Sequence, residues 1–139
     1  MQELSIPYGF GTAVHAPYGE AVERTRAALA AEGFGVLTEI DVRATLEKKL
    51  GAEFRPYVIL GACNPPLAHR ALSAELPIGL LLPCNVVVYA GDREGESVVA
   101  AMDPVAALEL AHNDAIRPIA EEVKSRLERV LAAVRSAAS

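Results

Sequence analysis

The sequence predicts a single α+β domain that spans residues 1–139. Short apolar segments of strand character recur along the chain, and segments with apolar residues at helical spacing separate them. Of the 139 residues, 52% are hydrophobic and 22% are charged, a composition that favours a globular fold. A chain of this length can bury a core without disulfides or metal ions, and it shows no internal repeat or linker.

The N-terminal part predicts alternating strands and helices. Residues 6–14 form one predicted strand, because larger side chains alternate there with glycines at positions 9 and 11. A helix follows over residues 17–33, with a proline in its first turn and a glycine at its end. Residues 34–41 return as a strand, and residues 41–51 form a short amphipathic helix.

The remaining chain continues this pattern and ends in a long helix. In order, we expect a strand at 55–63, helix at 66–76, strand at 80–91, strand at 97–102, helix at 104–112 and a final helix after Asp114. The strand at 55–63 is apolar on both sides and should be central. The final helix carries one apolar stripe from Ile116 to Val134, so it should lie on a sheet or a partner.

Charge and hydropathy argue against two classes of partner. The net charge is −5, and the basic residues of 124–135 are interleaved with acids, so the clustered cations that nucleic-acid binding requires are missing. No segment is apolar for the roughly 18 residues that a membrane span needs. With no secretory signal, we expect a cytoplasmic protein with two reduced cysteines.

The common catalytic and cofactor motifs are missing from the sequence. The two "GFG" segments do not extend to a dinucleotide or phosphate loop, and close packing explains them better. His15, His69 and His112 have no catalytic pattern around them, and the cysteines lack the spacing of a zinc site. We therefore expect no metal and no cofactor, and the sequence leaves open whether the protein is an enzyme.

Two Cys-Asn steps are the most distinctive local feature. "GACNPP" at 61–66 ends one predicted strand and starts a helix, and "PCN" at 83–85 opens the next strand. The candidate ligand-binding residues are Cys63, Asn64, Pro65, Cys84 and Asn85. Small apolar cysteines at strand ends are the competing structural interpretation.

The chain from Asp41 to Gly91 resembles the domain of unknown function 302 family. The resemblance rests on "K-x-L-G…F-R-P-Y", on "LGACNP…A…AL" and on "G-LLPCNV-VY", and "DP…L" at 103–108 also matches. It extends from Tyr8 to about Val134. The resemblance implies a curved, mainly antiparallel sheet of about five strands with helices packed on one side, a TBP-like fold, and a homodimer. It implies no established activity, and a remote fold relation does not carry DNA binding to this chain.

The implied antiparallel topology would place both cysteines on one rim of the sheet. Cys63 would end one strand and Cys84 would begin its neighbour, whereas a parallel crossover would separate them by the length of a strand. We therefore expect a small-ligand-binding or accessory module with a pocket near the two Cys-Asn steps, binding an unidentified small molecule. The alternative is a thiol-dependent redox or metal-binding protein that uses Cys63 and Cys84.

Overall fold

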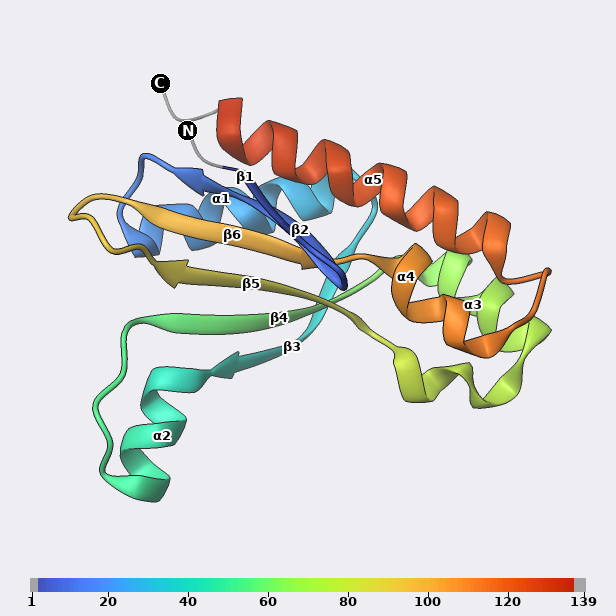
Figure 1. Cartoon of the computed structure of the whole chain (residues 1–139), viewed down its shortest axis with the longest axis horizontal. Coiled ribbons are helices and arrows are strands. Elements are labelled where there is room, and N and C mark those ends of the chain that lie inside the picture. Colours follow the sequence, from blue (N-terminus) through green and yellow to red (C-terminus); the bar gives the residue numbers. More distant parts are fainter. Residues whose placement is uncertain (1–2, 137–139) are drawn as a thin grey trace.

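The protein folds as one open antiparallel sheet with helices over one of its faces (Figure 1). The computed structural model describes residues 3–136. In these residues the sheet contains six strands in the order β1-β2-β6-β5-β4-β3. The strands are β1 (Glu3–Ile6), β2 (Gly9–Val14), β3 (Gly35–Asp41), β4 (Tyr57–Cys63), β5 (Cys84–Ala90) and β6 (Ser97–Met102). All neighbouring pairs are antiparallel, which confirms the predicted α+β class and sheet type.

The sixth strand arises because residues 6–14 are not one strand. Pro7 and Tyr8 make a two-residue turn, and Ile6 pairs with Gly9 across it. β1 and β2 therefore form a hairpin, and β1 becomes the edge strand. The prediction of a single strand from Ile6 to Val14 was wrong at this point, because the alternation of large and small side chains continues through the turn.

Five α-helices complete the fold, together with two 3₁₀ segments, within residues 3–136. The α-helices are α1 (Tyr18–Ala31), α2 (Val42–Leu50), α3 (Pro65–Ala74), α4 (Pro104–Leu108) and α5 (Arg117–Ser136), and the 3₁₀ segments are η1 (Leu76–Leu81) and η2 (Glu109–Ala111). α3, η1 and α4 gather at the end of the sheet where β4 stops and β5 starts (Figure 1).

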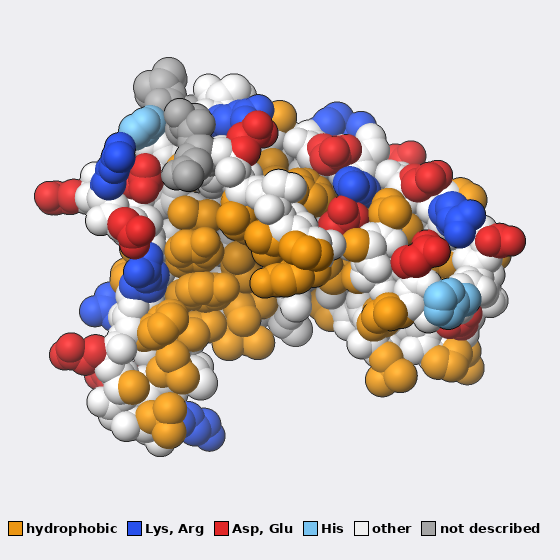
Figure 2. All heavy atoms as spheres, in the orientation of Figure 1, with side chains coloured by type: hydrophobic (Ala, Val, Ile, Leu, Met, Phe, Trp, Pro, Cys, Tyr) orange, Lys and Arg blue, Asp and Glu red, His pale blue; other side chains and the backbone are white. Residues whose placement is uncertain are grey.

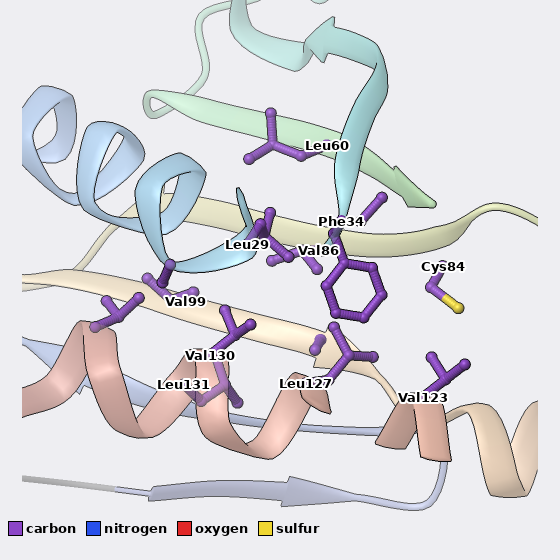
Figure 3. Close-up of a cluster of buried hydrophobic side chains, with 14 of the residues drawn as sticks. Leu29, Phe34, Leu60, Cys84, Val86, Val99, Val123, Leu127, Val130 and Leu131 are labelled. Atoms are coloured by element: carbon purple, nitrogen blue, oxygen red, sulfur yellow. The ribbon is translucent and has the colours of Figure 1, made fainter. Parts of the chain in front are cut away.

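The core lies between α1, α5 and one face of the sheet (Figure 3). Alternate positions of the strands supply the sheet side of this core, and Leu60, Val86 and Val99 are fully buried there. Leu29 of α1 and Leu127 of α5 are also fully buried against these strands. The stripe predicted for the final helix is confirmed, because its members at helical spacing are the buried residues of α5.

A glycine turn brings the chain from α1 back to the sheet. Gly33 has a φ of 84°, and its N–H donates to the carbonyl of Ala30. The N–H of Phe34 donates to the carbonyl of Leu29 at 2.9 Å, which completes a Schellman motif. The motif directs Phe34 into the core, where its ring lies near Cys84 and Leu127 (Figure 3).

Candidate functional site

An apolar cavity of about 260 Å³ lies where β4 ends and β5 begins. Its walls come from these strand ends, from α3, η1, α4 and α5, and from the chain after α1. We call it the cysteine pocket, and its principal lining residues are Phe34, Cys63, Leu67, Ala71, Leu82, Cys84 and Val123. Leu37 and Leu72 are the most exposed of the large apolar lining residues and form its rim.

The strand register places the two cysteines at the same end of the β4-β5 pair, and both line this pocket. Cys84 pairs directly with Ala62, so Cys63 lies one residue along from the partner of Cys84. Both thiols are free, Cys84 is buried, and Cys63 is partly exposed. The register therefore places both cysteines on one rim of the sheet, as expected for an antiparallel pair.

Burial keeps both thiols protonated at neutral pH. Burial raises the pKa of the Cys84 thiol to about 11, and the neighbouring thiol of Cys63 adds to the effect. Burial also raises the pKa of the Cys63 thiol above its ordinary value. A reactive cysteine requires the opposite shift, because the thiolate is the nucleophile and the metal ligand. The pocket is therefore a neutral apolar environment.

Asn64 supplies the single conventional polar side chain in the lining. It is buried, and its Oδ1 accepts a hydrogen bond from the backbone N–H of Leu67 at 3.2 Å. This bond caps α3, whose first two residues, Pro65 and Pro66, need no N–H partner. The Asn-Pro-Pro step is thus explained as a helix start, and it holds Leu67 against the pocket.

Two of the candidate residues do not line the pocket. Pro65 is exposed in the first turn of α3. Asn85 is exposed and follows Cys84 along β5, so its side chain points to the opposite face of the sheet. The structure therefore brings Cys63, Asn64 and Cys84 together in one cavity and leaves Pro65 and Asn85 outside it.

Most of the lining was not identified from the sequence. Phe34, Leu82 and Val123 belong to segments far apart in the chain, and each looks like an ordinary core residue in its own segment. The helical spacing of Leu67 and Ala71 could have placed both on the inner side of α3. No sequence pattern, however, shows that the segments carrying these residues leave a cavity between them.

No cluster of three or more potential metal ligands occurs within residues 3–136. His69, six residues after Cys63, is exposed on α3 and does not line the cysteine pocket. In the same part of the chain, no helix is both long and apolar enough to cross a bilayer.

The thiols give a direct chemical prediction. With a pKa of about 11 instead of 9.0, Cys84 has about a hundredfold less thiolate at pH 7. We expect iodoacetamide to label Cys84 at least about a hundredfold more slowly in the native protein than in guanidinium, since burial adds to this ionisation effect. Cys63 should be labelled before Cys84. Mass spectrometry of timed samples measures both rates, and equal native and unfolded rates for Cys84 would contradict the described burial.

A second hollow, of about 470 Å³, lies between the β1-β2 hairpin and α5. Four of its five charged side chains are paired with one another, and Glu128 is the exception. Lys124 Nζ lies 2.9 Å from Asp103 Oδ2, and Arg135 lies 3.3 Å from Glu3. Asp103 also caps α4. These contacts fasten α5 to the sheet, so we regard the hollow as structural.

Comparison with known proteins agrees with the resemblance seen in the sequence. The family model "Domain of unknown function DUF302" matches residues 10–134. The chain is similar to the solved structure of the "uncharacterized conserved protein DUF302 from Bacillus stearothermophilus", with 33% sequence identity and a TM-score of 0.84. That match covers 92% of this chain and 98% of the other. No curated protein sequence matches the chain. The extent of the family match shows that the chain belongs to the DUF302 family.

Proposed function

We propose that the protein binds a small, uncharged and largely apolar molecule in the cysteine pocket. The supporting observation is a cavity of about 260 Å³ in which Asn64 is the single polar lining side chain besides the thiols. Protein pockets for small molecules are typically apolar concavities with few polar groups. A cavity of about 150 Å³ lined by aliphatic and aromatic side chains is enough to hold benzene, so this one can take a larger molecule.

The lining sets the chemistry of the ligand. A charged group would lose its hydration here and find no opposite charge, because the lining contains no Lys, Arg, Asp or Glu. Both thiols remain neutral, so they contact the ligand as polarizable apolar groups. The Oδ1 of Asn64 is occupied by Leu67, which leaves the amide N–H₂ as the conventional side-chain donor in the lining. A molecule with one acceptor oxygen and an apolar body fits these groups.

Filling the pocket should remove binding. Ala68 lines the pocket from α3, whereas Ala74 is exposed on the same helix outside it. We expect the uncharged fluorophore N-phenyl-1-naphthylamine to bind the natural protein, and Ala68→Phe to weaken this binding at least about tenfold. Ala74→Phe is the matched control and should leave the affinity unchanged. A fluorescence titration measures all three, and equal affinities or no binding to the natural protein would reject the proposal.

Thiol chemistry is the second candidate, because Cys63 and Cys84 line the same cavity. Two thiols that each release a proton could hold a soft ion such as Cu(I). The raised pKa of both thiols opposes this function. Titration with Cu(I) separates the candidates. Binding that Cys63→Ser and Cys84→Ser each abolish would favour thiol ligation, and absence of binding would reject it.

A further inference from the structure

A third hollow, of about 260 Å³, lies on the face of the sheet opposite α1 and α5, which we call the open face. It adjoins the turn that joins β5 and β6. Figure 2 shows apolar side chains over the strands of this face and charged side chains at their left edge, where that turn lies. The lining residues of the hollow are Glu3, Leu4, Ala13, Arg55, Tyr89, Gly91, Asp92, Glu96 and Val98. The hollow thus combines apolar walls with a charged end.

Tyr89 is the aromatic wall of this hollow. The strand register places Tyr57, Tyr89, Val98 and Ala13 in one row across the open face. One face of the Tyr89 ring stacks on Tyr57, with the ring centroids 5.1 Å apart and the planes inclined by 8°. Tyr57 is not part of the lining, so the hollow lies on the other side of Tyr89, over Val98 and Ala13. That free ring face can stack on a flat group of a ligand.

The charged end of the hollow contains one carboxylate that is not paired within residues 3–136. Arg55 Nη1 lies 3.1 Å from Asp92 Oδ1, and Arg135 Nη1 lies 3.3 Å from Glu3 Oε1. No Lys, Arg or His of the same part of the chain forms an ion pair with Glu96. Glu96 is therefore the carboxylate that a cationic ligand can use.

Gly91 allows the side chain of Glu96 to lie against the hollow. The N–H of Gly91 donates to the carbonyl of Glu96 at 2.8 Å. A Cβ at Gly91 would lie 2.8 Å from Oε1 of Glu96, so the carboxylate lies directly over this glycine. Glu96 is partly buried as a result, whereas Arg93 and Glu94 of the same turn are exposed and do not line the hollow.

We propose that this hollow binds an organic cation that has a flat aromatic body and a single positive charge. The ring of the ligand stacks on the free face of Tyr89, and its ammonium group lies against the carboxylate of Glu96. The face of an aromatic ring also attracts a cation, so Tyr89 and Glu96 favour the same ligand charge. The site is independent of the cysteine pocket, because the two linings have no residue in common.

Methyl NMR with three probes of similar shape and different charge tests this inference. The probes are the cation 1-naphthylmethylammonium, the neutral 1-naphthalenemethanol and the anion 1-naphthaleneacetate. At pH 7 we expect the cation to shift the methyl signals of Leu4, Ala13 and Val98, which line the hollow. The neutral and anionic probes should bind there at least about fivefold more weakly. Binding of the neutral probe in the cysteine pocket would appear instead at the methyl groups of Leu67 and Val123.

Two matched pairs of variants locate the binding of the cation. Glu96→Gln removes the charge and keeps the shape, so it should weaken binding at least about fivefold. Glu94→Gln makes the same change in the same turn outside the hollow and should leave the affinity unchanged. Tyr89→Leu removes the ring and should also weaken binding at least about fivefold. Tyr8→Leu is its control, because Tyr8 is 69% exposed in the β1-β2 turn and lies outside the lining.

The outcomes are distinct. Shifts at the three methyl-bearing lining residues, with affinity lost in Glu96→Gln and Tyr89→Leu alone, support the proposed site. Three results overturn it: no shift at these residues, equal binding of the cation and the neutral probe there, or equal effects of Glu96→Gln and Glu94→Gln. The last result would show that the cation responds only to the net negative charge of the chain.

Discussion

Replacing Gly11 by alanine is expected to destabilise the protein by about 3 kcal/mol. A Cβ at this position would lie 2.5 Å from the carbonyl oxygen of Val99 and 2.7 Å from the Cβ of Ala100. These atoms belong to the backbone and the first side-chain carbon of β6, so no rotamer change can move them away. The β2-β6 ladder must shift instead, and β2 connects β6 to the edge strand. Denaturation with guanidinium measures the loss.

Gly19→Ala is the matched control for this substitution. Gly19 lies in α1, and a Cβ there would have no neighbour within 4 Å. Alanine favours helix over glycine by up to about 1 kcal/mol, so this variant should be as stable as the natural protein or more stable. The pair makes the same chemical change with opposite expected signs. Equal stability of the Gly11→Ala variant would show that β2 and β6 approach less closely than described.

Phe34→Ala should also have a large effect and lower the free energy of unfolding by about 3 to 5 kcal/mol. The ring is 4% exposed, and it separates the cysteine pocket from the core beneath α1 and α5. Its removal takes away apolar contacts and leaves a cavity that joins the pocket. Chemical denaturation gives the stability. Phe34→Leu keeps most of the side-chain volume, so it should lower the free energy of unfolding much less. Equal losses of stability in both variants would contradict the described packing.

The sequence predicted the sheet and its helices well because their signals are local. Buried strands appear in the sequence as apolar runs. Asp41, Asn64 and Asp103 each cap the helix that begins directly after that residue. The hairpin at Pro7 and Tyr8 was missed because alternation does not distinguish a strand from a two-residue turn between strands. The position of Cys63 beside Cys84 followed from the antiparallel order that the family resemblance implied.

The candidate site was predicted only in part. Cys84 and Asn85 are consecutive in one strand, so alternation alone could have placed Asn85 on the open face. Pro65 was included for its sequence neighbours, although a proline at the start of a helix has a sufficient structural reason. The pocket itself depends on how α3, α5 and the end of β4 are spaced, and such tertiary spacing leaves no local pattern.

Methyl NMR during titration with N-phenyl-1-naphthylamine shows whether the ligand binds in the cysteine pocket. Binding in the pocket should give the largest chemical-shift changes at the methyl groups of Leu67, Leu82 and Val123, which line it. Methyl groups of Ile59 and Val87, on the open face of the sheet, should change little. Changes centred on Ile59 and Val87, or no changes at any methyl group, would contradict it.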